Sequence, residues 1–391
     1  MHPSRLRKLL STLIAGAALS ALTTVAVAMP SAVTSPLQPI RIVSTPNPSV
    51  LPLLLAMARD PNLPVQLMPV GSGAGINDAF ASQGAEGLLA MTWVAASEVT
   101  NGVVPDLKLV TVNFWRGFFE LTPSANHIAN LSDLTGKNLL LSGPVGSGRD
   151  SGPDILFKAM MKREGYDPST YSENTVTINV GGSSLSVIRR VYPSGDFRVY
   201  YMPAMAAAKV LISQTVLDDG DGVTSNDQPA SGSFMVDPAA TGIVMNGTMQ
   251  GLSLTKSIDV QQEFSGYRAW PANELPLGGL SLRASVLNDP SRAAEVQQVR
   301  MAYEKAASDL MAARGHPLVM LGLASAISQG ITTYYQQYGL SLPAPVIAAA
   351  IRNGDLVYRT DTTVDSLMPD LVDFDTELLG SKPPESFYLP R

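Results

Sequence analysis

Cysteine is absent from the 391 residues, and histidine occurs only as His2, His127 and His316. Without cysteine the chain has no disulfide, no thiolate metal site and no cysteine nucleophile. Histidine is the side chain that most often serves as a general base. Its scarcity therefore leaves few positions at which a serine nucleophile could be activated.

Charged residues are also few. They make up 15% of the chain, against about 25% in a typical soluble domain, and the net charge is −6. Lysine and arginine form no dense cluster, which nucleic-acid binding would require. The composition therefore predicts no nucleic-acid partner.

Long apolar runs are missing after the N-terminal region, where the pattern is that of a secretory signal. Arg5, Arg7 and Lys8 precede an apolar run from Leu9 to about Leu22, and Ala26-Val27-Ala28 follows. This order predicts a signal peptide of residues 1–28, cleaved after Ala28, and export to the periplasm. An uncleaved anchor is the alternative, but polar residues dilute a run that would need ~20 apolar positions.

The first part of the remaining chain alternates short apolar runs with loops and helical segments. The expected strands are 40–43 and 65–70, with further apolar runs at 88–93 and 107–112. A helix is expected to begin at the N-cap Ser49, and a second to span 76–83. This alternation predicts a mostly parallel sheet flanked by helices.

The same alternation returns further along the chain. Expected strands are 138–141, 176–180 and 198–202, and expected helices are 131–134, 150–164, 184–192 and a segment after Pro203. Near the C-terminal part, Asp289 and Pro290 predict the start of a long helix. We therefore predict an α/β fold with two lobes. The stretch 218–232 has the composition of a surface loop, and its Asp-Gly-Asp-Gly sequence lacks the spacing of an EF-hand.

Several phrases resemble a known family. They are Ile40-Arg41-Ile42, Leu131-Ser132-Asp133-Leu134-Thr135-Gly136-Lys137, Gly165-Tyr166-Asp167-Pro168 and the segment 196–203. In these the chain resembles the type II periplasmic solute-binding proteins of ABC importers, in the branch of nitrate, sulfonate, taurine and thiamine-precursor binders. Met202 departs from the pattern, because many relatives carry an acidic residue there.

The resemblance implies two lobes, each a mostly parallel sheet with helices, joined by two crossover strands. Lobe 1 would be residues 39–123 and 277–391, and lobe 2 residues 124–276. It implies a monomer without cofactor or metal that is not an enzyme. Such a protein captures a small anionic or zwitterionic solute by lobe closure and delivers it to an ABC permease.

Four loops at the carboxyl ends of the expected strands are candidates for the binding site, because ligands of open parallel sheets bind at that edge. They offer backbone N–H groups at helix N-termini, which suit an anion. Their candidate residues are Thr45, Asn47, Gly71, Ser72, Gly73, Ser142, Gly146, Ser147, Gly148, Gly182, Ser183 and Ser184. The alternative is that these are ordinary tight turns between strands and helices.

Charged and aromatic side chains complete the candidate site. Arg149 could bind an acid group through two hydrogen bonds; the alternative is a solvated surface residue, as most arginines are. Trp93, Trp115 and Tyr201 could form walls of the cleft or belong to the core.

Two other functions stay open at this point. One is an exported serine hydrolase using Ser72 or Ser147 with His127 or His316 as the base. The other is a ligand-sensing receptor for a membrane sensor, which would use the same kind of cleft.

Overall fold

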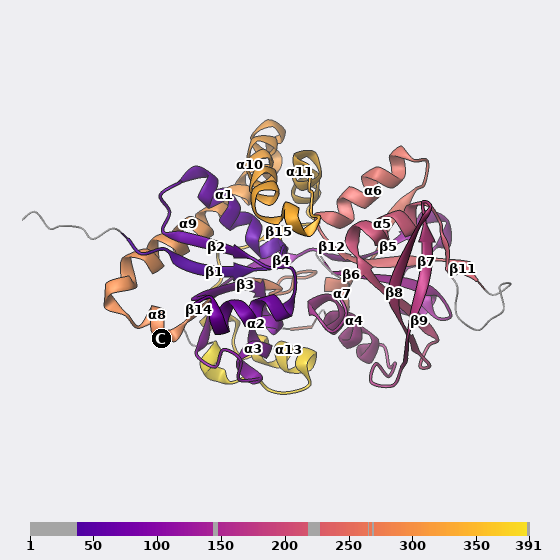
Figure 1. Cartoon of the computed structure of the whole chain (residues 1–391), viewed down its shortest axis with the longest axis horizontal. Coiled ribbons are helices and arrows are strands. Elements are labelled where there is room, and N and C mark those ends of the chain that lie inside the picture. The colour runs from indigo at the N-terminus through magenta and orange to yellow at the C-terminus, as the bar shows by residue number, and fades with distance from the viewer. Residues whose placement is uncertain (1–36, 144–147, 218–226, 265, 268–269, 389–391) are drawn as a thin grey trace, which may run out of the picture. The chain divides into compact units, whose positions relative to one another are not determined.

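The computed structural model describes residues 37–143, 148–217, 227–264, 266–267 and 270–388. The fold below is that of the compact unit Gln38–Arg391 (Figure 1). The expected signal peptide lies outside the described residues.

The first sheet has six described strands in the order β15-β4-β14-β3-β1-β2. Strands β1, β2 and β3 are mutually parallel in this sheet, whereas β14 runs antiparallel to both β3 and β4. The bounds are β1 Ile40–Ser44, β2 Val65–Pro69, β3 Gly87–Met91, β4 Leu107–Arg116, β14 Gly278–Arg283 and β15 Val357–Tyr358.

Helices cover both faces of this sheet (Figure 1). Helices α1, α9, α10 and α11 bury their apolar residues mainly on one face, and α2, α3, α12 and α13 mainly on the other. The bounds are α1 Leu51–Arg59, α2 Gly73–Ser82, α3 Thr92–Thr100, α8 Ala284–Leu287, α9 Ala293–Ala312, α10 Pro317–Tyr335, α11 Ala344–Asn353, α12 Val364–Leu367 and α13 Asp370–Leu379.

The second sheet has seven described strands in the order β13-β5-β12-β6-β9-β8-β7. Its centre is parallel, because β6 pairs with β9 and β12 in that sense, and both edges are antiparallel. The bounds are β5 Phe118–Pro123, β6 Asn138–Gly143, β7 Ser172–Val180, β8 Ser183–Tyr192, β9 Phe197–Pro203, β12 Gly232–Val236 and β13 Leu254–Asp259.

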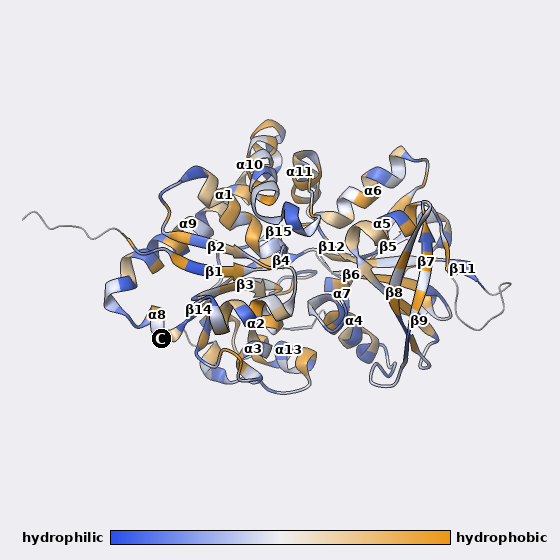
Figure 2. Cartoon of the chain, in the orientation of Figure 1, coloured by the Kyte–Doolittle hydropathy of each residue, from blue (hydrophilic) through white to orange (hydrophobic). Residues whose placement is uncertain are grey.

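Helix α4 packs on one face of the second sheet, and α5 and α6 pack on the other. The bounds are α4 Gly152–Arg163, α5 Ala204–Ile212, α6 Ala239–Met249 and α7 Val260–Glu263, and a separate pair is formed by β10 Val216–Leu217 and β11 Gln228–Pro229. All residues of the central strands β6 and β12 are buried, as expected for strands covered on both faces. Figure 2 shows hydrophobic and hydrophilic residues mixed along the strands β1 and β2.

Short 3-10 helices lie at several helix ends and loops. They are η1 Pro48–Val50, η2 Ser124–Asn126, η3 Leu131–Leu134, η5 Pro290–Arg292, η6 Ala313–Gly315, η7 Gln336–Tyr338 and η8 Glu385–Phe387. Before η5, Asp289 accepts a hydrogen bond from the N–H of Ser291, so the predicted cap is confirmed. Before η1 the cap is Asn47 and not Ser49, because the Asn47 side chain accepts from the Ser49 N–H.

The predicted helix 184–192 is wrong, because this segment is strand β8. Gly181 and Gly182 have φ angles of 56° and 80° and form the two-residue loop of a hairpin between β7 and β8. Two consecutive residues at positive φ fit the twist of a hairpin, and glycine adopts them without strain. Strand β8 also pairs with β9, so this segment extends the sheet instead of covering it.

The chain crosses between the sheets twice. It leaves the first sheet at Gly117, between β4 and β5, and returns between β13 and β14. Each sheet therefore receives an antiparallel strand from the crossing segments: β5 beside β12, and β14 beside β3. In the described part of the chain, no helix combines the length and hydropathy that a membrane span requires.

Candidate functional site

Two cavities lie at the carboxyl ends of the parallel strands of both sheets. The larger, which we call the wide cavity, encloses about 850 Å³, part of it open to solvent. From the first sheet and its helices it is lined by Thr45, Asn47, Gly71, Ser72, Gly73, Ile76, Ala90, Met91, Val94, Ser97 and Glu98. From the second it is lined by Phe118, Asp150, Ser151, Gly152, Pro153, Ile155 and Val236.

The first wall of the wide cavity contains the N-terminus of α2. Ser72 is the N-cap of this helix, and its Oγ accepts a hydrogen bond from the Gly75 N–H at 3.2 Å. The N–H groups of the first helical turn have no partner within a helix, and the helix dipole places partial positive charge there. This wall can therefore donate hydrogen bonds to an acid group.

The opposite wall contains the N-terminus of α4. Its N-cap is Ser151, whose Oγ donates to the carbonyl of Gly148 at 2.6 Å. Gly148 has φ +73°, and a Cβ there would lie 2.5 Å from the Gly143 nitrogen. Only glycine fits this close approach between the loop and the end of β6.

An ion cluster around the buried Arg190 side chain holds the loop before α4 in place. Arg190 of β8 donates two hydrogen bonds to the Asp150 carboxylate, at 2.9 and 2.8 Å, and one to Asp154 at 3.1 Å. Its Nε donates to Glu173 of β7 at 2.7 Å. The hydrogen bonds from Arg190 lower the pKa of Asp150 to about 2. The hairpin β7–β8 therefore fixes a loop that lines the wide cavity.

Glu98 of α3 also lines the wide cavity. Glu98 is 9% exposed. In the part of the chain that the structure describes, its carboxylate has no hydrogen bond and no ion pair. Burial raises the pKa of this carboxyl group above its usual value.

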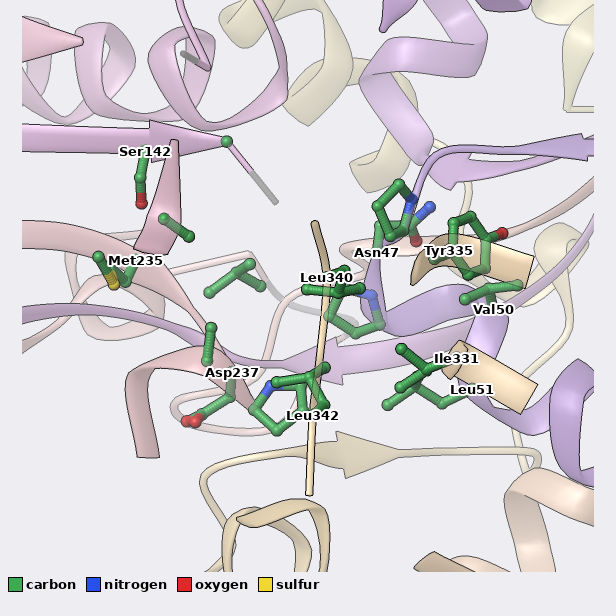
Figure 3. Close-up of a pocket in the computed structure, with 17 residues that line it drawn as sticks. Asn47, Val50, Leu51, Ser142, Met235, Asp237, Ile331, Tyr335, Leu340 and Leu342 are labelled. Carbon is green, nitrogen blue, oxygen red and sulfur yellow. The ribbon is translucent and has the colours of Figure 1, made fainter. Parts of the chain in front are cut away.

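The second cavity, which we call the apolar cavity, encloses about 510 Å³ (Figure 3). Figure 3 shows Asn47, Val50, Leu51, Ile331 and Tyr335 on one side of it and Ser142, Met235 and Asp237 on the other, with Leu340 and Leu342 between. Its side chains offer mainly aliphatic and aromatic carbon. It shares Asn47 and Val236 with the wide cavity.

No protein-family model matches the chain, and no curated protein sequence matches it closely enough to count. Solved structures do match. The periplasmic aliphatic sulphonate binding protein SsuA of Escherichia coli is 11% identical, with a TM-score of 0.55 over 88% of this chain and 86% of that chain. The chain has the periplasmic binding protein fold.

Two further structures share this periplasmic binding protein fold. The alkanesulfonate-binding protein SsuA of Xanthomonas axonopodis pv. citri, bound to MOPS, is 15% identical, with a TM-score of 0.51 over 90% of this chain and 94% of that chain. The ligand binding component of an ABC-type import system of Staphylococcus aureus, with zinc bound, is 13% identical, with a TM-score of 0.52 over 89% and 94%. The two-lobe α/β prediction is thereby confirmed at the level of fold.

The Staphylococcus aureus structure contains bound zinc, so we looked for side chains in this chain that could bind a metal ion. Among the described residues of this chain, no group of three or more histidine, cysteine, aspartate or glutamate side chains is placed to hold a metal ion.

Within the binding-protein fold, the structure brings two of the four predicted loops to the wide cavity. Thr45, Asn47, Gly71, Ser72 and Gly73 all line it. The Asn47 amide already donates to the carbonyls of Thr45 and Leu89 and accepts from Ser49, so it shapes the loop after β1.

The third predicted loop is divided. Ser142, at the end of β6, lines the apolar cavity. Gly148 shapes the loop but does not line either cavity. Gly146 and Ser147 lie outside the described residues.

The fourth predicted loop is placed elsewhere. Gly182, Ser183 and Ser184 lie at the exposed turn of the β7–β8 hairpin and line neither cavity. The prediction assumed a helix after the glycines, and the hairpin removes the helix N-terminus on which the anion-binding argument relied.

The predicted charged and aromatic residues also differ from the expectation. Arg149 forms an ion pair with Glu173 at 2.8 Å and does not line the wide cavity. Trp93 and Trp115 are fully buried in the core, where their indole N–H groups donate to the carbonyls of Gly152 and Val112. Tyr201 is buried too, and its hydroxyl donates to Asp154 at 2.8 Å. All three aromatic residues therefore belong to the core and do not form walls of the cleft.

Three polar residues that line the wide cavity, Glu98, Asp150 and Ser151, were not predicted from the sequence. Ser151 stands before Gly152-Pro153 and could have been found as an N-cap followed by proline. Glu98 gives no such local signal, because a glutamate within a helix is ordinarily solvated.

Proposed function

We propose that the chain is the periplasmic solute-binding component of an ABC importer, which captures a small anionic or zwitterionic solute and delivers it to a permease. The observation that carries the proposal is the wide cavity, lined from both sheets at the carboxyl ends of their parallel strands. The binding-protein fold supports it.

Solute capture would use contacts from both sheets at once. Gly73 at the start of α2 and Ser151 at the start of α4 line the same cavity from different sheets. A ligand that contacts both walls favours the arrangement in which they face each other, and the crossing segments provide the hinge. We propose that this closure, in a monomer, is the signal that the permease reads.

Contacts outside the cavity would set how readily the sheets separate. Arg163 of α4 forms an ion pair with Glu377 of α13 at 2.6 Å, and Lys256 of β13 forms one with Asp355 at 2.8 Å. Both pairs join elements of the second sheet to elements of the first. They would break on opening and re-form on closure.

The first test is thermal unfolding of the purified protein with sulfonates, nitrate, carboxylates, phosphonates and thiamine precursors. A ligand present at 100 times its dissociation constant, and bound only by the folded state, adds about 2.7 kcal/mol to the free energy of unfolding. We expect one class to raise the unfolding midpoint. A panel without any rise would contradict the proposal.

A variant locates the binding site. A Cβ atom added at Gly73 would meet no heavy atom within 4 Å, so Gly73→Phe should fold and fill part of the wide cavity. We expect it to lose the ligand-induced rise, measured by the same thermal unfolding. Gly322→Phe on α10 is the matched control, because that glycine is also helical with nothing within 4 Å and lines neither cavity.

If the protein were a serine hydrolase with Ser72 as its nucleophile, a histidine would be needed beside Ser72 to act as the base. His127 and His316 are the histidines that the structure describes, and neither lines the cavity that contains Ser72. A screen for hydrolysis of generic esters tests this alternative directly, and we expect no turnover.

A further inference from the structure

Glu98 sets the charge of the wide cavity. A buried carboxylate is costly unless it is paired, yet this residue is 9% exposed and has no partner among the described residues. It lines the wide cavity, so its carboxylate is available to a bound molecule.

The other charges of the cavity do not balance Glu98. Asp150 is the second charged residue in the described lining, and it is already bound by Arg190 and Lys158. No lysine, arginine or histidine lines the cavity in the part of the chain that the structure describes. A solute that is purely an anion would therefore meet an uncompensated negative charge.

The first turn of α2, on the same wall, offers the opposite character. The N–H groups at the start of a helix and the helix dipole favour an acid group, and Ser72 and Gly73 both line the cavity. One cavity thus presents a donor region and a buried carboxylate to the same small molecule.

Taking the proposed function as its basis, we propose that the solute is a zwitterion: its acid group lies at the N-terminus of α2, and its ammonium group pairs with Glu98. Of the two solute classes that the sequence leaves open, anionic and zwitterionic, this proposal selects the zwitterionic one. An ammonium next to Glu98 also offsets the burial that raises the pKa of this carboxyl group.

The test compares taurine, which carries both charged groups, with two probes that each lack one of them. Ethanesulfonate lacks the ammonium group, and ethylamine lacks the sulfonate group. Dissociation constants are measured by calorimetry on the whole protein and on Glu98→Gln, a variant of nearly the same size. We expect the unaltered protein to bind taurine at least about 10-fold more tightly than either single-charge probe. We expect Glu98→Gln to weaken taurine at least about 10-fold and to leave ethanesulfonate unchanged or bound more tightly.

Asp78→Asn is the matched control, because Asp78 is an exposed carboxylate on α2 that does not line the cavity. It should change neither affinity. Ethanesulfonate binding as well as taurine, or Glu98→Gln weakening both alike, would overturn the zwitterion inference while leaving a solute receptor in place. If neither these probes nor the wider panel bound, the inference and the proposed function would both fall.

Discussion

The loop at Gly71–Gly73 and the loop at Gly181–Ser184 are both built of glycine and serine, yet their surroundings are opposite. The first follows a parallel strand, begins helix α2 and lines the wide cavity. The second joins two antiparallel strands and lies exposed at the turn of a hairpin. The composition of a loop therefore does not tell whether it binds a ligand. What matters is whether a helix N-terminus follows at the carboxyl edge of a sheet.

The hairpin nevertheless acts on the cavity, through its strands and not through its turn. Arg190 of β8 reaches Asp150, which lines the wide cavity, and Tyr171 and Tyr201 stack near its guanidinium at 4.5 and 5.2 Å. The comparison thus predicts large effects at the base of the hairpin and small ones at its turn.

The largest effect is expected for Arg190→Met. The Arg190 side chain is 3% exposed and its partner Asp154 is 0% exposed, so the variant leaves a buried carboxylate with fewer partners. Removing one member of a buried ion pair costs about 3–5 kcal/mol. Chemical denaturation should show a loss of this size, and calorimetry should show weaker ligand binding, because the loop before α4 loses its support.

Arg149→Met is the matched control for this variant. Its side chain is 37% exposed, and an exposed ion pair contributes about 0–1 kcal/mol. Equal losses in the two variants would show that the base of the hairpin has no special role.

A smaller effect is expected at the hairpin turn. Gly182 has φ +80°, so Gly182→Ala places a side chain in the left-handed region, at a cost of about 1–2 kcal/mol. Ligand affinity should not change, because Gly182 lines neither cavity. Gly73→Ala should have the opposite result. Gly73 does not have a positive φ and a Cβ there meets no heavy atom within 4 Å, so the free energy of unfolding should be unchanged, whereas ligand affinity should fall. Denaturation and calorimetry on both variants would separate turn from site, and a loss of affinity in Gly182→Ala would break the comparison.

The smallest effect is expected in the pH dependence. Arg190 lowers the pKa of Asp150 to about 2, below the value of about 3.9 expected for an unfolded chain. The ionised form is therefore favoured in the folded state, so its contribution is present above pH 4 and is lost as the pH falls towards 2. Unfolding free energies measured across this range should fall less steeply in Asp150→Asn than in the unaltered protein. Identical slopes would argue against the Arg190–Asp150 interaction.

Much of the fold could be predicted from local patterns. The parallel strands β1, β2 and β6 and the helices α2, α4 and α9 have clear apolar periodicity, and the cap at Asp289 was found from its own residue and the proline after it. The segment 184–192 was mistaken for a helix. A pair of glycines flanked by alternating residues is a hairpin signal in its own right, and the expectation of a repeated strand–helix unit overrode it.

The candidate site could be predicted only where it depends on a strand followed by a helix. Gly71, Ser72 and Gly73 were found because Ser72 caps a helix that the pattern already indicated. Arg149 was placed next to the ligand because it follows a glycine loop, but the hairpin provides Glu173, which binds it instead.

The sequence by itself determined the alternation of strands and helices, the absence of cysteine chemistry and the loop at Ser72, because each depends on residues close together in the chain. The tertiary structure alone decided which loops share a cavity, that Glu98 faces it without a partner among the described residues, and that Arg190 binds Asp150 forty residues away. The physical reason is that burial and ion pairing depend on which strands become neighbours, and β8 lies between β7 and β9, of which only β7 is its neighbour through a local turn.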